Sequence, residues 1–285
     1  RKISNLPKGP TNITWSPDGS QIAFVMLKEN EAPKIVDMPK APAGAKWKEG
    51  PHITDKLVYR FDGAGYLTPG YYHIYIIPAD GGTAKQISSG DFNHGGPTSR
   101  GAGPLNWSLD GSSITQSLNR QDFAEYNVMN SNIYSYNVKD GSITQLTDRD
   151  GPDNGAVLSP DGKWLAYIGF DDRKQGFQRS TLHIIPAGGG VPKILSDDID
   201  RSIRGMKWDP NSKSIVVMYN NHGMGIMGRF GLNGKFTEIT QTGQSSAFTI
   251  SDNGKIALTH IDTKTSPEIA IVGKGGALNQ ITHVN

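Results

Sequence analysis

The sequence predicts an all-β fold, a β-propeller of four-stranded antiparallel blades, and three observations lead to this class. A turn followed by a strand-like apolar run occurs five times along the 285 residues. Two strands around a glycine-rich turn follow each copy. No stretch of ten or more residues carries the 3.6-residue period of an amphipathic helix. Tandem four-stranded units of about 40 to 50 residues are typical of a propeller.

The first repeated element joins a tight turn to an apolar strand. Its copies are "WSPDGSQIAFV" (15–25), "WSLDGSSITQS" (107–117), "LSPDGKWLAYI" (158–168), "WDPNSKSIVVM" (208–218) and "ISDNGKIALTH" (250–260). Pro presets φ at the second position of a type I turn, and Gly tolerates the exit. We expect the Trp, Leu or Ile before each turn to pack between neighbouring blades.

The second repeated element supplies the other two strands of each unit. Its copies lie at 73–88, 132–147, 182–196, 226–240 and 268–282, and most contain Asp-Gly, Gly-Gly or Asn-Gly followed by a "QIS" or "QLT" type ending. These dipeptides supply the positive φ that tight hairpins need. In the third unit we expect strands at 154–158, 163–169, 181–185 and 192–195.

The repeats divide one propeller domain, residues 1–285, into five units. We place them at about 10–90, 103–148, 154–197, 203–241 and 246–283, with an insertion at 28–72 in the first unit. Residues 1–6 match the end of a repeat, since Lys2-Ile3-Ser4 resembles Gln86-Ile87-Ser88, and we expect them to be the remnant of an upstream unit. Five visible units fit either a ring that closes with five blades or an arc of a seven- or eight-bladed propeller.

Composition excludes several classes of protein. The net charge is +2 with both signs interspersed, which differs from the basic stripe of a nucleic-acid-binding protein. No run of 18 apolar residues is present, so no membrane-spanning helix is expected. Cys is absent, which removes thiolate metal sites and a Cys nucleophile but leaves the compartment open between bacterial cytoplasm and periplasm.

No cofactor or metal site is predicted. Gly223–Gly228 fits the G-x-G-x-x-G pattern, but it stands between two strands, and a dinucleotide site needs a helix after it. The aspartates of "DRDGPDN" (148–154) and "SDDIDRS" (196–202) lack the spacing of a calcium loop and fall where polar turns are expected.

The insertion holds the candidate binding residues. Residues 29–50 are rich in Pro, Lys and Ala and are expected to form a loop. "DKLVYRFDGAGYL" (55–67) alternates like a strand, with Leu57, Tyr59 and Phe61 on one face. We select four residues as candidate contacts to substrate or to an adjoining domain: Tyr59, Arg60, Asp62 and Tyr66. The alternative is that Arg60 and Asp62 form a structural ion pair.

The repeats and the insertion together resemble a known family. The "WSPDG", "DGG" and "QIS/QLT" pattern resembles the TolB-type propeller repeat. "KLVYRFDGAGYL" (56–67), "HIYIIPADGG" (73–82) and the final "SPEIAIVGKGGALNQITHVN" resemble the propeller of acylaminoacyl-peptidase and dipeptidyl-peptidase-like enzymes of the prolyl oligopeptidase family. This resemblance implies an α/β-hydrolase domain as a downstream partner and peptides as substrates.

No catalytic residue is predicted in this chain itself. A serine hydrolase carries its nucleophile on a G-x-S-x-G elbow, and the nearest match, Gly243–Ala247, lacks the second Gly and a following helix. The resemblance therefore implies a non-catalytic propeller that controls access of short peptides to the hydrolase domain of a serine peptidase. The alternative is a TolB-type protein-binding propeller without a peptidase domain. A five-bladed glycosidase is disfavoured because the expected innermost strands carry almost no carboxylates. Peptide specificity and oligomeric state stay open.

Overall fold

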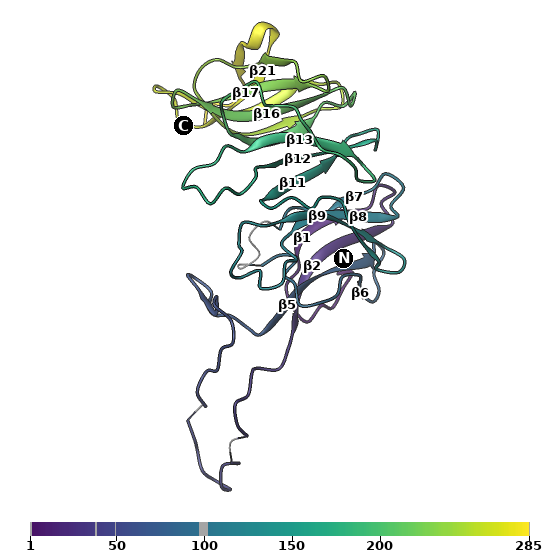
Figure 1. Ribbon diagram of the computed structural model, residues 1–285, viewed down its shortest axis with the longest axis vertical. Coiled ribbons are helices and arrows are strands. Elements are labelled where there is room, and N and C mark those ends of the chain that lie inside the picture. Colours follow the sequence, from purple (N-terminus) through teal and green to yellow (C-terminus); the bar gives the residue numbers. More distant parts are fainter. Residues whose placement is uncertain (1, 38, 49, 97–101, 285) are drawn as a thin grey trace.

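The computed structural model describes residues 2–37, 39–48, 50–96 and 102–284. Its main strands form antiparallel four-stranded units, here called blades 1 to 5, which follow one another along the longest axis of the molecule (Figure 1). Blade 1 lies beside blade 2 in one half of the molecule, and blade 5 lies at the opposite end. The all-β class and the four-stranded blades are as the sequence predicts, and the five blades form an open arc of a propeller.

The strands of each blade lie side by side in chain order. Blade 1 consists of β1 (Thr11–Trp15), β2 (Gln21–Glu29), β5 (Gly70–Pro78) and β6 (Lys85–Gln86). Blade 2 consists of β7 (Asn106–Trp107), β8 (Ser113–Leu118), β9 (Asn132–Asn137) and β10 (Ile143–Gln145). Blade 3 consists of β11 (Asp153–Leu158), β12 (Trp164–Gly169), β13 (Thr181–Pro186) and β14 (Lys193–Ile194). The strands expected in this unit agree with the observed ones to within one residue at each end.

Blades 4 and 5 are linked into one eight-stranded sheet. Blade 4 consists of β15 (Ile203–Trp208), β16 (Ser214–Asn221), β17 (Met224–Gly231) and β18 (Phe236–Glu238). Blade 5 consists of β19 (Gln244–Ile250), β20 (Ile256–Ile261), β21 (Glu268–Val272) and β22 (Leu278–Gln280). A single parallel pairing, Gly225 with Gln244, joins them.

Among the described residues, helical structure is restricted to one turn. A short 3₁₀ helix, η1 (Lys274–Gly276), lies in the hairpin between β21 and β22. No helix in the described part of the chain has the length and apolar character needed to cross a membrane.

The Ser-x-Asp turn of the first repeat is closed by side-chain hydrogen bonds. The Ser16 hydroxyl donates to Asp18 over 2.6 Å, and the pairs Ser108–Asp110 and Ser159–Asp161 have the same spacing. These hydroxyl donors, together with backbone and side-chain donors from the residue two positions after each aspartate, lower the pKa of Asp18 and that of Asp110 to about 2. The repeated aspartate is therefore a turn-forming residue.

The "QIS/QLT" ending ties the outer strand to the third strand. In each blade the Ser or Thr oxygen accepts a hydrogen bond from a third-strand N–H, as the Ser88 oxygen does from Ile74 at 2.8 Å. The equivalent acceptors in the other blades are Thr147, Ser196, Thr240 and Thr282. This bond adds one hydrogen bond to the sheet beyond the last strand pair. The Ser or Thr of the "QIS/QLT" ending therefore recurs because it has the same structural role in every blade.

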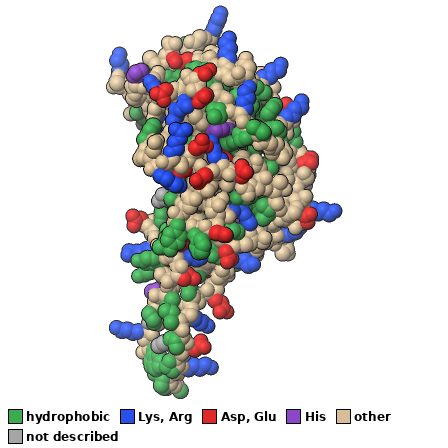
Figure 2. Space-filling model, viewed as in Figure 1, with side chains coloured by type: hydrophobic (Ala, Val, Ile, Leu, Met, Phe, Trp, Pro, Cys, Tyr) green, Lys and Arg blue, Asp and Glu red, His purple; other side chains and the backbone are tan. Residues whose placement is uncertain are grey.

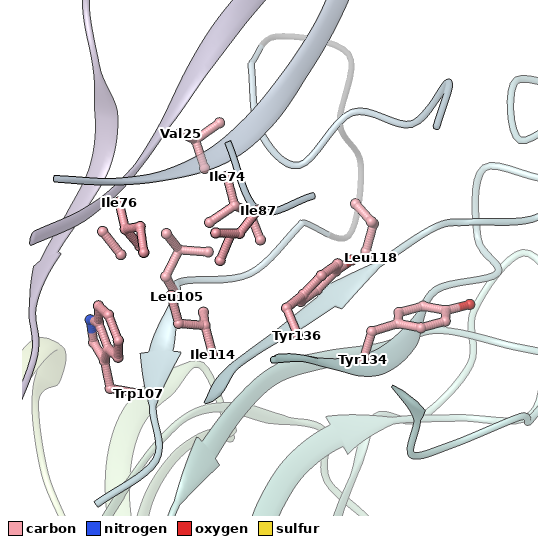
Figure 3. Packing of buried hydrophobic residues seen from close by; sticks show 11 residues of the cluster. Val25, Ile74, Ile76, Ile87, Leu105, Trp107, Ile114, Leu118, Tyr134 and Tyr136 are labelled. Carbon is pink, nitrogen blue, oxygen red and sulfur yellow. The ribbon is translucent and has the colours of Figure 1, made fainter. Parts of the chain in front are cut away.

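Apolar side chains fill the spaces between successive blades. Between blades 1 and 2, Val25, Ile74 and Ile76 meet Trp107 and Ile114, all of them buried (Figure 3). Similar clusters lie between each later pair of blades. Each blade thus stabilises its neighbours through close-packed apolar side chains.

The tryptophans before the turns do not all pack between blades. Trp107 and Trp208 are buried, and Trp208 donates its indole N–H to the Val157 carbonyl of blade 3 at 3.0 Å. Trp15 is instead 58% exposed, because no preceding blade covers that face of β1 within the described residues. The expectation is therefore wrong for the first repeat.

Residues 2–6 lie against blade 1 as outer strands lie against the next blade. Ile3 and Leu6 pack on the apolar face formed by β2 and β5. The hairpin Gly81 approaches the Ile3 carbonyl oxygen so that a Cβ would lie 2.9 Å from it, and Gly141 of blade 2 approaches the Ile87 carbonyl in the same way, at 2.7 Å. The position of Ile3 thus matches that of Ile87. The upstream unit itself stays a prediction.

A glycine at this inter-blade contact is expected to be more sensitive to substitution than a glycine in an open turn. At Gly276 a Cβ would overlap the Ile239 carbonyl oxygen of blade 4. Gly254 has a similar positive φ, 79° against 83°, but nothing lies within 4 Å of its Cβ position. We expect Gly254→Ala to cost about 1 kcal/mol from backbone strain. Gly276→Ala should lose about 1–3 kcal/mol more from the overlap. Urea unfolding of both variants measures the difference, and equal losses would contradict the contact.

Candidate functional site

Strand direction separates the blade connections onto two faces. Turns between first and second strands and between third and fourth strands lie on one face, and all other connections lie on the opposite face. The opposite face includes residues 30–69, which leave blade 1 between β2 and β5 and are here called the arm, so we name it the arm face. The arm projects away from the blades, with hydrophobic and basic side chains along it (Figures 1 and 2).

The candidate residues lie on a short hairpin within the arm. Strands β3 (Arg60–Phe61) and β4 (Gly65–Tyr66) pair, with Arg60 opposite Tyr66. Gly63 and Gly65 have φ of 79° and 72°, values that only glycine adopts easily, which explains why "DGAG" turns the chain here. The long alternating strand expected at 55–67 is wrong, because this two-residue pairing leaves Leu57, Tyr59 and Phe61 exposed instead of burying one face.

Aromatic rings gather at the base of the hairpin. The His52 and Tyr66 rings stack with centroids 4.6 Å apart and planes 7° from parallel, and the Tyr59 ring lies 6.1 Å from that of Tyr66. The Leu67 N–H donates to the Tyr59 carbonyl at 2.9 Å, which extends the pairing of the hairpin by one backbone hydrogen bond. Two of the four candidates thus meet, and His52 joins them.

Two further contacts fasten the arm to the blades. Lys56 Nζ donates to the Tyr71 hydroxyl at 2.9 Å, and this bond, above all, raises the pKa of Lys56. The Leu57 N–H donates to Glu125 Oε2, in the loop of blade 2, at 2.8 Å. The arm is therefore held by blade 1 and by its neighbour, which fixes the position of the hairpin.

A hollow of about 1000 Å³ opens between the arm and the rim of blade 1. Tyr59 and Tyr66 line it, together with His52, Lys56 and Tyr72. Arg60 and Asp62 do not line it. They are exposed on the same hairpin, and no ion pair joins them in the described structure, so the structural ion pair considered from the sequence is wrong.

The other motifs considered from the sequence have structural roles. Ser245 lies on β19 and is fully buried, so its hydroxyl is not presented on a nucleophile elbow. Gly223–Gly228 lies in the β16–β17 hairpin. In the two aspartate clusters, Asp153 pairs with Arg149 and Asp197 pairs with Arg179.

Sequence reasoning missed His52 and Lys56, which line the hollow, and Glu125, which holds the arm beside it. His52, Lys56 and Glu125 are single residues in polar loops, and their contacts join segments up to 68 residues apart. No local pattern reports such contacts. The prolines and aromatic residues around Lys56 were the available signal that this loop packs against something.

Comparison with known proteins shows which propellers this fold resembles. No protein-family profile matches the chain. The fold superimposes on the acylaminoacyl peptidase of Pyrococcus horikoshii with a TM-score of 0.69 and 18% identity, over 99% of this chain and 40% of that one. It also matches a TolB-like protein of Agrobacterium tumefaciens with a TM-score of 0.60 and 16% identity, over 98% of this chain and 83% of that one. The fold is that of the TolB and acylaminoacyl peptidase propellers.

Two sequence relatives match this chain over much of its length. The chain is 26% identical to dipeptidyl-peptidase 5 of Porphyromonas gingivalis over 289 aligned residues, covering 97% of the propeller but 41% of the relative. It is 27% identical to an uncharacterized protein of Agrobacterium fabrum over 63% of the propeller and 56% of that protein. The propeller thus spans less than half the length of the peptidase it matches.

Proposed function

We propose that this propeller is the non-catalytic part of a serine peptidase and that it controls which peptides reach a hydrolase domain. The likeness to dipeptidyl-peptidase 5 over 97% of the chain supports a peptidase context. The reaction would release aminoacyl, acylaminoacyl or dipeptidyl units from short peptides. We assign no catalytic role to the described residues, and the nucleophile would belong to the adjoining domain.

One structural observation carries the proposal: the arm and the end of blade 5 share a face. The Val284 N–H donates to Glu268 Oε1 at 2.8 Å, and Glu268 begins β21 on the arm face. A hydrolase domain joined after this segment would therefore start on the face where the arm and its hollow lie. Residues of the hairpin, including Arg60 and Asp62, would stand between that domain and solvent.

The hollow has the chemistry that a short peptide requires. Stacked rings of His52, Tyr59 and Tyr66 offer apolar faces for side chains, and the tyrosine hydroxyls offer partners for peptide N–H and C=O groups. A hollow of about 1000 Å³ accommodates a few residues and excludes a folded protein.

Peptide binding to the isolated chain tests this proposal. We expect tripeptides to shift NMR signals of the arm, and Tyr66→Ala to weaken binding about fivefold or more because it removes the central ring of the stack. Phe123→Ala is the matched control, since Phe123 is an exposed aromatic residue on the neighbouring loop and does not line the hollow. Absence of any peptide binding would contradict the proposal.

The likeness to the TolB-like protein favours a second candidate, a propeller that binds a folded protein. In that case a folded partner would bind more tightly than any short peptide, and Tyr66→Ala would leave its affinity unchanged.

A further inference from the structure

Arg120 differs from other partly buried arginines of the chain in what surrounds its charge. It follows β8 on the arm face, with its guanidinium carbon 4.2 Å from the centroid of the Phe92 ring and 5.6 Å from that of Tyr134. Its Nη1 is buried and has no hydrogen-bond partner. The Phe92 and Tyr134 rings stack on the guanidinium but leave Nη1 without an acceptor. The Tyr136 hydroxyl is a hydrogen-bond partner of the Arg120 side chain, but it is neutral and does not balance the charge.

Three other arginines meet a carboxylate. Arg149 pairs with Asp153, Arg179 with Asp197 at 3.1 Å, and Arg229 with Asp209 at 2.7 Å. Arg120 forms no ion pair with any described residue. Removing a guanidinium from water without an anion is costly, and cation–π contacts return only about 0.5–2 kcal/mol. Arg120 thus lacks the carboxylate partner that neutralises the charge of the other three arginines.

The described groups around Arg120 include only one carboxylate to set against two cations. Buried His73 and His94 lie close enough to interact with its charge, as does Lys28 with His73, whereas Asp91 is the one carboxylate among the named electrostatic partners. Burial, more than any other cause, lowers the pKa of His73 to about 4 and that of His94 to about 3, so both imidazoles are neutral at pH 7. Asp91 is exposed and lines the hollow.

We propose that Arg120 binds a carboxylate group of a peptide ligand at the junction of blades 1 and 2. A guanidinium presents paired N–H donors that match the two oxygens of a carboxylate. The loop that covers Arg120 also borders the hollow, because Phe92 stacks on the guanidinium while Asp91 and Asn93 line the hollow. A peptide in the hollow therefore lies one loop away from this charge. The carboxylate is the peptide's C-terminus or an acidic side chain. The inference rests on the proposed function in taking the ligand to be a peptide.

Binding of three peptides to the chain tests the site. The peptides are Ala-Ala-Ala with a free carboxyl terminus, the same peptide as its C-terminal amide, and Ala-Glu-Ala as its amide. We expect the free acid to bind at least about tenfold more tightly than its amide, as a hydrogen bond to a charged group predicts. Tight binding of the Glu-containing amide as well would show that the site accepts both a terminal and a side-chain carboxylate, whereas tight binding of that amide alone would assign it to side-chain carboxylates.

Substitutions distinguish carboxylate binding by Arg120 from an effect of the protein's overall charge. Arg120→Gln should abolish the preference for the carboxylate, Arg120→Lys should keep part of it, and Arg204→Gln should not change it, because Arg204 is exposed on β15 in blade 4. In the unchanged protein, bound carboxylate should also raise the pKa of His73 and His94, measured by NMR, because a nearby anion stabilises imidazolium.

Equal affinity for acid and amide would overturn this site and leave the proposed function intact. Absence of binding by all three peptides would overturn both.

Discussion

Arg149→Met is expected to destabilise the protein by about 3–5 kcal/mol, since it leaves the charge of Asp153 buried without a partner. Asp153 is fully buried at the start of β11, where its carboxylate meets the Arg149 guanidinium. Burial raises the pKa of Asp153 despite the opposing effect of Arg149, so loss of the cation would raise it further. Urea unfolding at pH 7.5 measures the loss.

Two comparisons identify the buried pair as the cause. Arg173→Met removes an exposed arginine from the following loop of the same blade, and we expect a change below about 0.5 kcal/mol. Adding Asp153→Leu to Arg149→Met should recover much of the stability, because apolar replacements for a buried ion pair are often tolerated. A loss below about 1 kcal/mol for Arg149→Met alone would contradict the role of the pair.

The stability of the protein is expected to fall steeply as the pH drops from 6.5 toward 4. His73, His94 and His183 are buried, and burial is the main reason that their pKa values fall to about 4, 3 and 4 from an ordinary 6.5. Below pH 6.5 these histidines bind protons in the unfolded chain but stay neutral in the folded chain, so acid favours unfolding. Each histidine contributes a slope of up to about 1.4 kcal/mol per pH unit in this window, and full stability is present above pH 6.5.

Urea midpoints between pH 7.5 and 4.5 measure this effect. His94→Gln should be less stable than the unchanged protein at pH 7.5, because Nε2 of His94 meets the Tyr136 hydroxyl at 3.1 Å in the core. Its stability should nevertheless depend less on pH. The turn aspartates act in a lower window, since a pKa of about 2 for Asp18 and Asp110 removes their contribution only as the pH falls below about 4. A midpoint that stays constant from pH 7.5 to 4.5 would contradict the neutral buried histidines.

The blades were predictable from the sequence because residues close together in each repeat determine its turns and hairpins. Ser16 and Asp18 close a turn within three residues, and the glycines of the hairpins supply positive φ where no other residue is comfortable. Strand periodicity then placed the third blade to within one residue. The resemblance to TolB-type propellers rests on the same turn and hairpin motifs.

The site was predictable only in part because its contacts are not local. Tyr59 and Tyr66 were found from their unusual segment, and they do meet, but the sequence could not place His52 against Tyr66 or Glu125 against Leu57. The alternation of residues 55–67 suggested a strand, whereas "DGAG" breaks it after two residues on each side. The proposed role of Arg120 could not be predicted from the sequence. It depends on contacts with Phe92 and Tyr134, and on the absence of an ion-pair partner among the described residues.

The central claim, that the propeller controls access to a hydrolase domain, is tested most directly in a chimaera. This chain would replace the matching part of Porphyromonas gingivalis dipeptidyl-peptidase 5, with and without residues 30–69 of the arm. The measured quantity is the ratio of cleavage rates for a short peptide and for a peptide of about 30 residues that carries the same N-terminal sequence. We predict a high ratio with the arm present and a marked fall when it is removed. An equal ratio in both proteins would contradict the claim.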